Sequence, residues 1–522
     1  MMDLPPLRTL LRDRAASFLF DRVDGAFLAC FRIVFGAAMA FFAVKQLAAG
    51  NVAWQYIDPP HHFHYYGFEW VKPWPGVGMY AHFAAMAIVA VMLMLGLFYR
   101  VATIAFALLF TWVFLLDRSY YLNHYYLIVL LSWMMTILPA DKVLSLDALQ
   151  NRWPQTATVP AWTLWLIRFY VALPYFFGGI AKIDGDWMQG QPMRLTLSTR
   201  PWYATVTEYI DGEILVQVFT WGGMLFDLLI VPALLWRRTR AAALCLVVAF
   251  HLTNAFVFPI GVFPWLMIAA TLVFLPPEFP RRLMSFIVGP DDDTPLKHEA
   301  VAQPTWATLS PNNRRIALGL AALVLTHCLL PFRYQLLDGD PNWTERGHCF
   351  SWHMMLRSKF GGVRVYVTDR RTGKTGITDL RQHVTAAQIR RVYRDPEHIR
   401  QLAHYVADYY RERGRPDVEV RVLAPVSLNG RKPRLMIDPR VDLAAESASW
   451  TRPDWILPLT EPLRHDHWDV PIWKWEQELG LDPEELLGVP LTRHERPAEQ
   501  ATTSENQFTS GTAHRNEKPA ES

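Results

Sequence analysis

Long apolar stretches fill the first two thirds of the chain, and charged residues collect after Phe332. A helix needs roughly 20 predominantly apolar residues to cross a bilayer. Runs near that length occur at 27–48, 78–99, 101–117, 124–140, 161–181, 216–236, 239–258, 259–277 and 315–331. This pattern predicts a polytopic α-helical membrane protein with about nine transmembrane helices.

The part after Phe332 has the alternation and turn residues of a water-soluble α+β, β-rich domain. We expect strands at Val363–Val367, Val418–Leu423 and Arg434–Ile437, turns at Arg371-Thr372-Gly373 and Asn429-Gly430, one helix from Thr385 to Arg413 that Gly414 stops, and a last helix within Trp473–Leu487. The expected organisation is a cytoplasmic segment (1–26), a transmembrane helical domain (27–331), an extracytoplasmic domain (332–490) and a disordered polar tail (491–522).

Basic residues mark alternate connections between the apolar runs, which indicates their cytoplasmic side. These connections carry the N-terminal arginines, Arg100, Lys142 with Arg152, the Arg237-Arg238-Arg240 cluster, Arg281-Arg282 and Arg314-Arg315. The other connections, and everything after Phe332, are expected outside. No small-residue cleavage site follows the first run, so we interpret it as a span and not as a cleaved signal. The location would be the bacterial inner membrane, or the endoplasmic reticulum with a lumenal C-terminal domain in a eukaryote.

Composition and charge narrow the classes of partner. The chain has 522 residues, 52% of them hydrophobic, and a formal net charge of +3 without a basic stretch interleaved with aromatic residues, so nucleic acid is not an expected partner. Of the four cysteines only Cys349 lies in a polar segment, which argues against a disulfide framework. His61, His62 and His64 lack a carboxylate at a convincing ligand spacing, so we expect no metal.

Polar residues within apolar runs are costly and therefore mark candidate sites. They are Arg32, His82, Asn123, His124, Arg168, Lys182, Asp227, His251, Asn254 and His327. With the orientation above, His124, Lys182 and His251 reach a similar depth near the outer surface. Each also has a structural interpretation: an interfacial histidine, a lysine anchor that reaches the headgroups, and a hydrogen-bonded core histidine. Arg32 and Asp227 are expected to form a structural ion pair.

Five blocks of sequence carry a family resemblance. They are YLNHYYL around His124, YFFGGIAKIDGDW around Lys182, FHLTNAFVFPIGVFPW from Phe250, FSWHMMLRSKFGGVRVYVTDRRTGK from Phe350, and MIDPRVDL from Met436. In this order they resemble the successive signature blocks of the vitamin K-dependent gamma-glutamyl carboxylases, over residues from about 20 to 460.

The resemblance implies an enzyme of the carbon–carbon lyase class that oxidises vitamin K hydroquinone with O2 to the epoxide. The strong base formed in that oxidation takes a gamma proton from a glutamate residue, which then adds CO2. Lys182 matches the family's catalytic base, Asn123 and His124 match its Asn-His pair, and His251 matches a further active-site histidine. The implied partners are a glutamate-containing peptide or protein, the membrane quinone pool and the lipid bilayer.

The same blocks suggest the binding residues. Within them, Tyr175, Trp187, His251 and Asn254 are expected to bind the quinol, and Trp352, His353, Arg357 and Lys359 the peptide. Arg357 and Lys359 would attract an acidic peptide, although basic residues on a solvated face are the commoner case. Lys182 can accept a proton only as the free amine, a form that burial favours. Asp184 and Asp186 would oppose that form, so we expect them to point away or to be paired elsewhere.

Two departures bear on the substrate. The chain stops soon after the MIDPRVDL block, so the part of the domain that holds propeptides in animal members is expected to be reduced, and Cys349 alone cannot form their disulfide. In both features the chain resembles a bacterial relative of the family. The alternatives are a quinol epoxidase or monooxygenase without carboxylation, and a non-catalytic quinone- or lipid-binding membrane protein. A transporter is less favoured because the sequence shows no inverted repeat.

Overall fold

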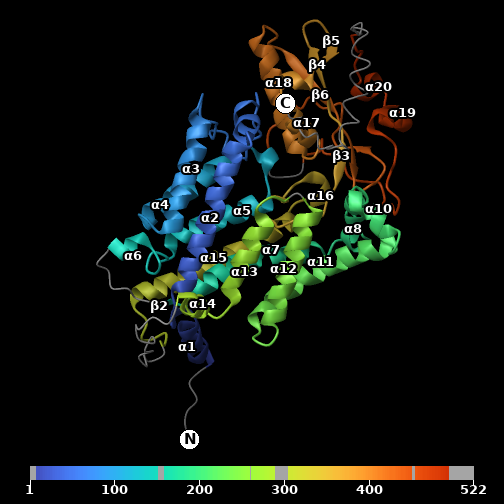
Figure 1. The fold of residues 1–522 in the computed structure, drawn as a ribbon. Coiled ribbons are helices and arrows are strands. Elements are labelled where there is room, and N and C mark those ends of the chain that lie inside the picture. The colour runs from blue at the N-terminus through green and yellow to red at the C-terminus, as the bar shows by residue number, and fades with distance from the viewer. Residues whose placement is uncertain (1–6, 151–157, 259, 289–303, 450–452, 493–522) are drawn as a thin grey trace, which may run out of the picture. The chain divides into compact units, whose positions relative to one another are not determined.

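The computed structural model describes residues 7–150, 158–258, 260–288, 304–449 and 453–492. It has two compact units (Figure 1). Unit 1 comprises the chain up to Leu337 together with Arg346–Leu356, and unit 2 comprises Asp338–Glu345 and the chain from Arg357 onward. The return of residues 346–356 to unit 1 differs from the single boundary expected at 332. The expected disordered tail, 491–522, lies almost wholly outside the described residues.

Unit 1 is almost entirely helical. Its α-helices are α1 (Leu7–Phe20), α2 (Ala26–Ala48), α3 (Gly78–Leu95), α4 (Tyr99–Leu116), α5 (Asn123–Ile137), α6 (Leu146–Gln150), α7 (Trp162–Ala181), α8 (Gly185–Met188), α9 (Met193–Ser198), α10 (Pro201–Thr207), α11 (Gly212–Leu235), α12 (Arg240–Val257), α13 (Phe263–Thr271), α14 (Phe279–Val288) and α15 (Pro311–Leu329). A short antiparallel ladder of β1 (Arg22–Asp24) and β2 (Thr158–Pro160) joins the starts of α2 and α7.

Seven of the described helices are long and apolar enough to span a membrane: α2, α3, α4, α7, α11, α12, and α15 with its extension to Leu336. The chain is thus a polytopic α-helical membrane protein, but the count of nine is not confirmed. The run 124–140 becomes the 15-residue helix α5, which ends where Leu138 takes an extended conformation before Pro139. The run 259–277 becomes α13 and a short 3-10 turn, and the chain then bends by 100° into α14.

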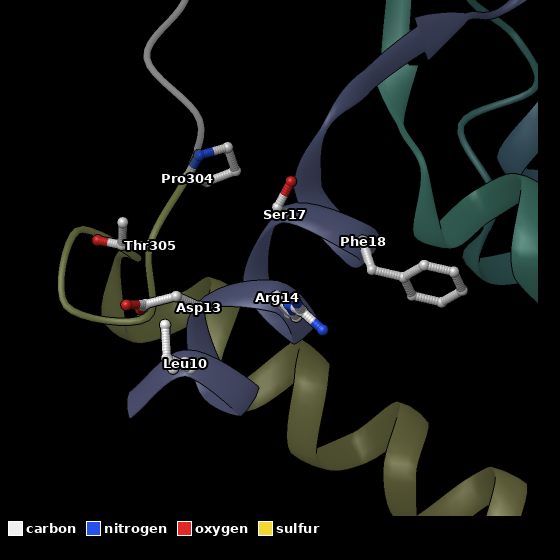
Figure 2. A pocket seen from close by; sticks show the side chains of 7 residues that line it. All are labelled: Leu10, Asp13, Arg14, Ser17, Phe18, Pro304 and Thr305. Carbon is white, nitrogen blue, oxygen red and sulfur yellow. The ribbon is translucent and has the colours of Figure 1, made fainter. Parts of the chain in front are cut away.

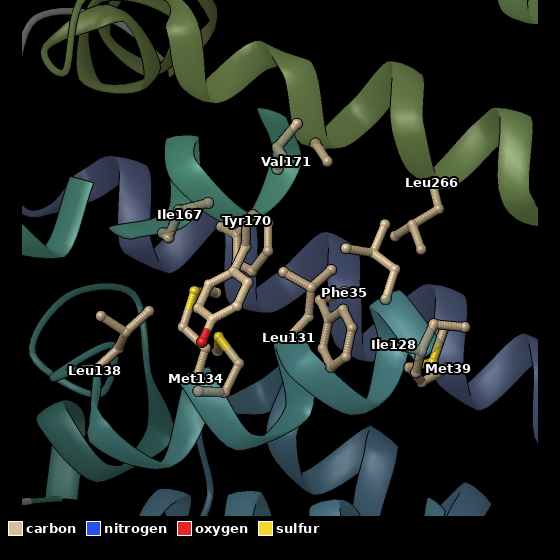
Figure 3. Close-up of a cluster of buried hydrophobic side chains, with 14 of the residues drawn as sticks. Phe35, Met39, Ile128, Leu131, Met134, Leu138, Ile167, Tyr170, Val171 and Leu266 are labelled. Atoms are coloured by element: carbon tan, nitrogen blue, oxygen red, sulfur yellow. The ribbon is translucent and has the colours of Figure 1, made fainter. Parts of the chain in front are cut away.

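The short helix α5 lies in the core of unit 1. Figure 3 shows its Ile128, Leu131 and Met134 among buried side chains of α2, α7 and α13. All three are at most 3% exposed. A helix enclosed on several sides by other helices is apolar all round. This explains why the sequence of α5 resembles that of a lipid-facing span.

Unit 2 combines two small antiparallel sheets with helices, as expected for an α+β domain. Its elements are α16 (Pro341–Thr344), β3 (Lys359–Gly361), β4 (Arg364–Asp369), β5 (Lys374–Ile377), α17 (Ala386–Val392), α18 (Pro396–Glu412), β6 (Val418–Leu423), β7 (Pro425–Leu428), β8 (Arg434–Leu435), α19 (Trp475–Leu479) and α20 (Pro483–Leu487). The strand orders are β5-β4-β6 and β3-β7-β8.

The three expected strands of unit 2 are confirmed as β4, β6 and β8. The single helix expected from Thr385 to Arg413 is wrong in one respect, because it is divided into α17 and α18. Thr385 caps α17 in a capping box with Gln388. Asp395 caps α18, whose first residue is Pro396, and a proline lacks the N–H that a continuous helix would need there. The last expected helix is likewise divided, into α19 and α20.

Candidate active site

One face of α7 carries the residues on which the site is built. Tyr175, Gly178, Gly179 and Lys182 follow one another at spacings of three, one and three residues, which places them on the same side of a helix. Lys182 caps the C-terminal end of α7, and its side chain turns back along the helix, so that Nζ lies 3.3 Å from the carbonyl oxygen of Gly178. The lysine is therefore directed into the helix bundle.

Lys182 forms a buried ion pair with Asp227 of α11. Its Nζ donates to Asp227 Oδ2 over 2.6 Å, and the two side chains are only 7% and 6% exposed. The expected pair of Arg32 with Asp227 is thus wrong. Arg32 instead donates to the carbonyl oxygen of Leu144, in space left by Gly96, which ends α3 with a φ of +64°. The sequence offered Asp227 as an intramembrane acid but not its partner.

An aromatic wall and a capped loop complete the surroundings of Lys182. The ring of Trp187 lies 5.3 Å from Nζ, and its indole N–H donates to the carbonyl oxygen of Thr220 over 3.1 Å. Trp187 therefore presents its apolar face to the lysine. The Asp184 carboxylate accepts from the backbone N–H groups of Asp186 and Trp187. Asp184 thus serves as the N-cap of α8. Its carboxylate is paired with backbone N–H groups, in line with the expectation that it is paired elsewhere than with Lys182.

A second polar pair lies two turns before Lys182. Tyr175 Oη is 2.6 Å from Nε2 of His251 on α12, and both side chains are buried. When the tyrosine donates to Nε2, the neutral imidazole carries its hydrogen on Nδ1 and can donate it. Nδ1 of His251 is buried and has no partner among the described residues. That nitrogen is available to a ligand hydroxyl or carbonyl. Asn254 lies three residues further along α12, on the same side of the helix.

A closed series of contacts, here called the contact ring, joins these residues to α5. The His251 and His124 rings both lie against Phe263, with centroids 6.1 and 5.3 Å away. Asn123, beside His124, donates through Nδ2 to the carbonyl oxygen of His353 over 3.2 Å. The next residue, Met354, returns to α7, because a methyl group on Gly178 would lie 2.6 Å from its Cε. The contact ring comprises Asn123, His124, Phe263, His251, Tyr175, Gly178, Met354 and His353.

The contact ring brings together the candidates Asn123, His124, Tyr175 and His251, with Lys182 hydrogen-bonded to Gly178 at its edge. Phe263 and Met354 were missed, since apolar residues within apolar segments give no sequence signal. The site offers a proton acceptor beside a carboxylate, an available imidazole nitrogen and aromatic walls that include the stacked rings of Phe226 and Phe250. Such a combination suits a lipophilic ligand that carries a weakly acidic hydroxyl group.

The four residues expected to bind peptide are largely enclosed. In unit 1, Trp352 is 1% exposed and packs on Tyr126, and His353 is 4% exposed and lies against Tyr334. In unit 2, the Lys359 side chain is 1% exposed. The structure therefore does not present Trp352, His353 and Lys359 as a surface for substrate.

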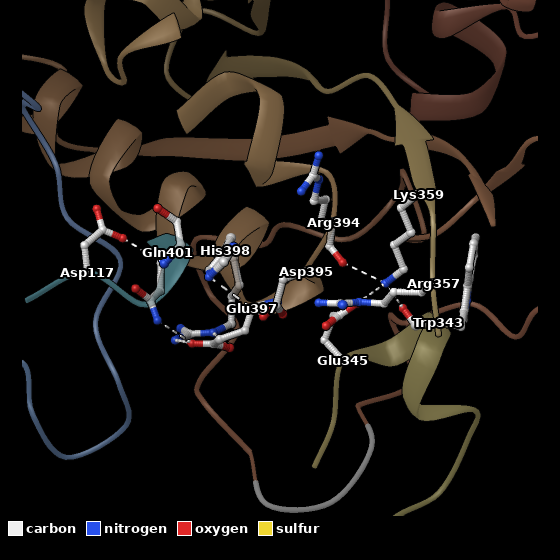
Figure 4. A network of polar contacts seen from close by, with 12 residues as sticks. Asp117, Trp343, Glu345, Arg357, Lys359, Arg394, Asp395, Glu397, His398 and Gln401 are labelled. Carbon is white, nitrogen blue, oxygen red and sulfur yellow. Dashed lines mark hydrogen bonds and ion pairs between the residues drawn. The ribbon is translucent and has the colours of Figure 1, made fainter. Parts of the chain in front are cut away.

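Lys359 lies in a buried polar network of unit 2 (Figure 4). Its ammonium group donates to Glu345 Oε1 over 2.6 Å and to the carbonyl oxygens of Trp343 and Arg394, each over 2.7 Å. Arg357, with 27% of its side chain exposed, donates to the same carboxylate oxygen. Burial lowers the pKa of the Lys359 amine, and the carboxylate of Glu345 opposes that change. All three ammonium hydrogens have acceptors, so Lys359 stabilises unit 2.

Two cavities lie away from the contact ring. One of about 370 Å³ is formed between α1 and the segment at Pro304 and Thr305 (Figure 2). Another of about 450 Å³ is lined by Trp74, Pro75, Gly78 and His82. Among the described residues no group of three or more His, Cys, Asp or Glu side chains is arranged to hold a metal ion. Of the three histidines considered from the sequence, His62 has its Nδ1 3.4 Å from Oδ2 of Asp117.

Comparison with known families accounts for both units. Residues 20–279 match the HTTM domain, and residues 312–462 match the domain described as vitamin K-dependent gamma-carboxylase, lumenal domain. No solved structure matches the chain. The first match covers the four helices α5, α7, α12 and α13 that contribute to the contact ring. The second begins in α15 and extends into unit 2 as far as residue 462, before α19 and α20. The chain belongs to the vitamin K-dependent gamma-carboxylase family.

Proposed function

We propose that this protein is an integral-membrane carboxylase and epoxidase that oxidises vitamin K hydroquinone with O2 and adds CO2 to glutamate residues. The observation that carries the proposal is the buried Lys182–Asp227 pair at the edge of the contact ring. It combines a group able to take the hydroquinone's proton with the available Nδ1 of His251 in an aromatic setting. Family membership supplies the reaction class, and these contacts supply the residues.

Each residue of the site has a task in this proposal. Reduced vitamin K, with O2, supplies the strong base that removes a gamma proton from glutamate. Lys182 Nζ accepts the proton of a quinol hydroxyl group, and His251, held by Tyr175, binds a ligand oxygen through Nδ1. Trp187 contributes an apolar wall, which excludes water from the amine. Asn123 anchors the His353–Met354 segment against α7, and so keeps the ring closed.

Oxidation without carboxylation is the second candidate, and one observation favours it. Lys359 and Arg357, the basic residues expected to attract an acidic peptide, both engage Glu345 within unit 2. Their positive charge is thus partly balanced, which weakens the electrostatic argument for a glutamate-rich partner.

Product analysis separates the two candidates. Purified protein in lipid would receive reduced vitamin K, isotopically labelled bicarbonate and a glutamate-containing peptide, and mass spectrometry would follow the quinone and the peptide. We expect the epoxide and a peptide heavier by one labelled carboxyl group. Epoxide without a change in the peptide would select the second candidate. Absence of both products, with Lys182→Arg protein as the blank, would overturn the proposed chemistry.

The proposed orientation places the N-terminus in the cytoplasm and unit 2 outside, because basic residues gather on alternate connections. In a background without native cysteines, Arg371→Cys should react with a membrane-impermeant maleimide in intact cells, whereas Arg238→Cys should react only after lysis. Both positions are exposed. With a cytoplasmic N-terminus, only nine crossings, in which both α5 and α13 span the membrane, give this result. With the seven spans alone both positions would lie outside, so the labelling also tests whether α5 and α13 both cross. The reverse labelling pattern would refute the orientation.

A further inference from the structure

We infer that Asp227 is the positioning residue of Lys182: its carboxylate fixes the amine against α7 and stabilises the proton that the amine accepts. The inference deepens the proposed function and rests on it for the identity of the proton donor. The pairing itself rests on the structure alone, since Nζ and Oδ2 are 2.6 Å apart and both side chains are at least nine-tenths buried.

A close approach of two helices produces the pairing. A methyl group on Gly179 would lie 2.8 Å from Cγ and Cδ2 of Leu228 and 3.0 Å from its backbone nitrogen. Leu228 directly follows Asp227, so the absence of a side chain at Gly179 lets α11 approach α7 where the carboxylate is needed. Small residues commonly permit such approach between membrane helices. On the other side, the absence of a side chain at Gly178 leaves room for Met354, whose Cε lies 2.6 Å from the Cβ position, with Oδ2 3.6 Å and Nζ 3.8 Å from the same position.

Stability alone is a poor explanation for the pair. Removing a lysine and a carboxylate from water costs several kcal/mol for each ion, and well-packed apolar side chains often replace buried ion pairs without loss. A functional explanation follows from the charges. The pair of free amine and carboxylate carries one negative charge, and it becomes neutral when Nζ accepts a proton. Without Asp227 the same uptake would leave an isolated ammonium ion in a dry site, which is far more costly.

The proton balance of the step is simple. The O–H bond of a quinol hydroxyl group breaks, its electron pair stays on the oxygen, and the proton forms the third N–H bond of Lys182. Asp227 Oδ2 accepts a hydrogen bond from that ammonium group throughout. No oxidant or reductant takes part in this transfer. The proton leaves Nζ to water before the next turnover.

Several titratable groups face this region, and they need to be kept constant in a test of pH dependence. Asp227 comes from α11, Tyr175 from α7 and His251 from α12. Asp184 and Asp186 follow Lys182 in the chain, and His124 and His353 belong to the contact ring. Only Asp227 is hydrogen-bonded to Nζ through a side chain among the described residues. Replacing it by asparagine changes the charge next to Nζ and leaves the other groups in place.

The direct test measures the amine without any quinone. Detergent-purified full-length protein would be pulsed with acetic anhydride across a pH series, and acetylation of Lys182 would be compared by mass spectrometry with that of the exposed Lys374. In Asp227→Asn we expect Lys182 to become reactive at lower pH than in the wild type, because the anion that stabilises its proton is gone. Asp227→Glu should restore the wild-type profile at least in part. Coincident profiles of wild type and Asp227→Asn would overturn the inference.

Epoxide formation gives the second readout. Asp227→Asn should lower its rate about 10- to 100-fold, the range that corresponds to loss of one charge-assisted hydrogen bond, and should move the acid limb of the pH–rate profile to lower pH. Loss of rate with an unmoved acid limb would indicate a structural role and overturn the inference. A third outcome separates the two proposals. If the wild type made no epoxide, while the acetylation profiles of the wild type and Asp227→Asn still differed as expected, the proposed function would be contradicted and the positioning role would remain supported.

If Asp227→Asn fails to fold, Gly179→Ala provides a second test, through the contact between α7 and α11. The added methyl group must displace Leu228, so the Nζ–Oδ2 contact should lengthen and the acetylation profile should shift in the direction seen for Asp227→Asn. Gly222→Ala is the matched control, because nothing lies within 4 Å of its Cβ position in α11. The control should retain the wild-type profile. Equal profiles for Gly179→Ala and Gly222→Ala would show that the close approach does not position the pair.

Discussion

Lys182→Arg protein is expected to make no epoxide, although it keeps a positive charge beside Asp227. Guanidinium stays protonated to above about pH 12 and so cannot accept the quinol proton. The loss should be at least about 10²- to 10⁴-fold, the usual contribution of a general base. Arginine can retain an ion pair with the buried carboxylate, so the variant should insert and fold. Epoxide formation by membranes with matched amounts of protein is the measurement.

Lys182→Ala should also be inactive, but it is the less informative variant. It leaves the Asp227 carboxylate, 6% exposed, without its lysine. Leaving one member of a buried ion pair unpaired typically costs about 3–5 kcal/mol. Lys182→Ala with Asp227→Asn avoids that cost and should fold better, yet remain inactive. Small primary amines added to the alanine variants should restore part of the rate, increasingly so as the pH approaches the amine's own pKa.

An anchoring role for Lys182 predicts the opposite series. A lysine that only reached the headgroups would be replaceable by arginine, and alanine would reduce the amount of inserted protein without changing the rate per molecule. Near-normal epoxide formation by Lys182→Arg would therefore remove Lys182 from the mechanism. The enclosed position of Lys182 already disfavours anchoring, because its Nζ is buried and turned back along α7 toward Gly178 and Asp227.

The hydrophobic pattern predicted the membrane helices well where a run was long and faced lipid. Seven of the nine runs form helices that can span a bilayer. The pattern was ambiguous for 124–140, because a helix surrounded by protein is as apolar as one surrounded by lipid. Its length was limited by Pro139, which the sequence does show. Similarly, Pro396 inside the helical pattern of unit 2 marked the start of a second helix, with Asp395 as its cap.

The polar candidates near the contact ring could be singled out from the sequence, but the apolar Phe263 and Met354 and the partner of Asp227 could not. Depth in the membrane placed His124, Lys182 and His251 at a similar level from the sequence alone. The partner of Asp227 depends on the rotation of α11 about its axis, which the contact between Gly179 and Leu228 sets. Matching charges by sign alone suggested Arg32. A long lysine side chain that returns along its own helix is equally invisible in the sequence.

The directions of the side chains in β3 could not be predicted from the sequence either. Alternation along a strand would normally bury Phe360 and expose its neighbour Lys359. The structure has the reverse, with Phe360 51% exposed and Lys359 5% exposed. Glu345 explains the inversion, since it supplies a buried carboxylate from a position 14 residues earlier in the chain. Glu345 has a φ of +60° at the end of α16. Neither feature has a signal in the sequence.

Glu345→Gln should destabilise unit 2 severely while changing the shape of residue 345 very little. The substitution leaves the ammonium group of Lys359, whose side chain is 1% exposed, without a counter-charge. Breaking a buried pair in this way typically costs about 3–5 kcal/mol. For a domain of this size, that loss corresponds to a fall in Tm on the order of 10 °C. Lys359→Met combined with Glu345→Gln should recover much of the lost stability, because the double variant removes the buried ammonium group together with its carboxylate partner.

Thermal proteolysis of the detergent-purified full-length chain measures this effect, with mass spectrometry following cleavage within residues 357–449. Asp408→Asn is the matched control, since it breaks an Arg411–Asp408 pair whose side chains are 44% and 65% exposed. Exposed pairs contribute little to stability, so the control should melt with the wild type. If Glu345→Gln melted with Asp408→Asn, the buried network would not stabilise unit 2, and Lys359 would again become a candidate for binding an acidic substrate. If the double variant were no more stable than Glu345→Gln, the carboxylate would be needed by Arg357 and not by Lys359.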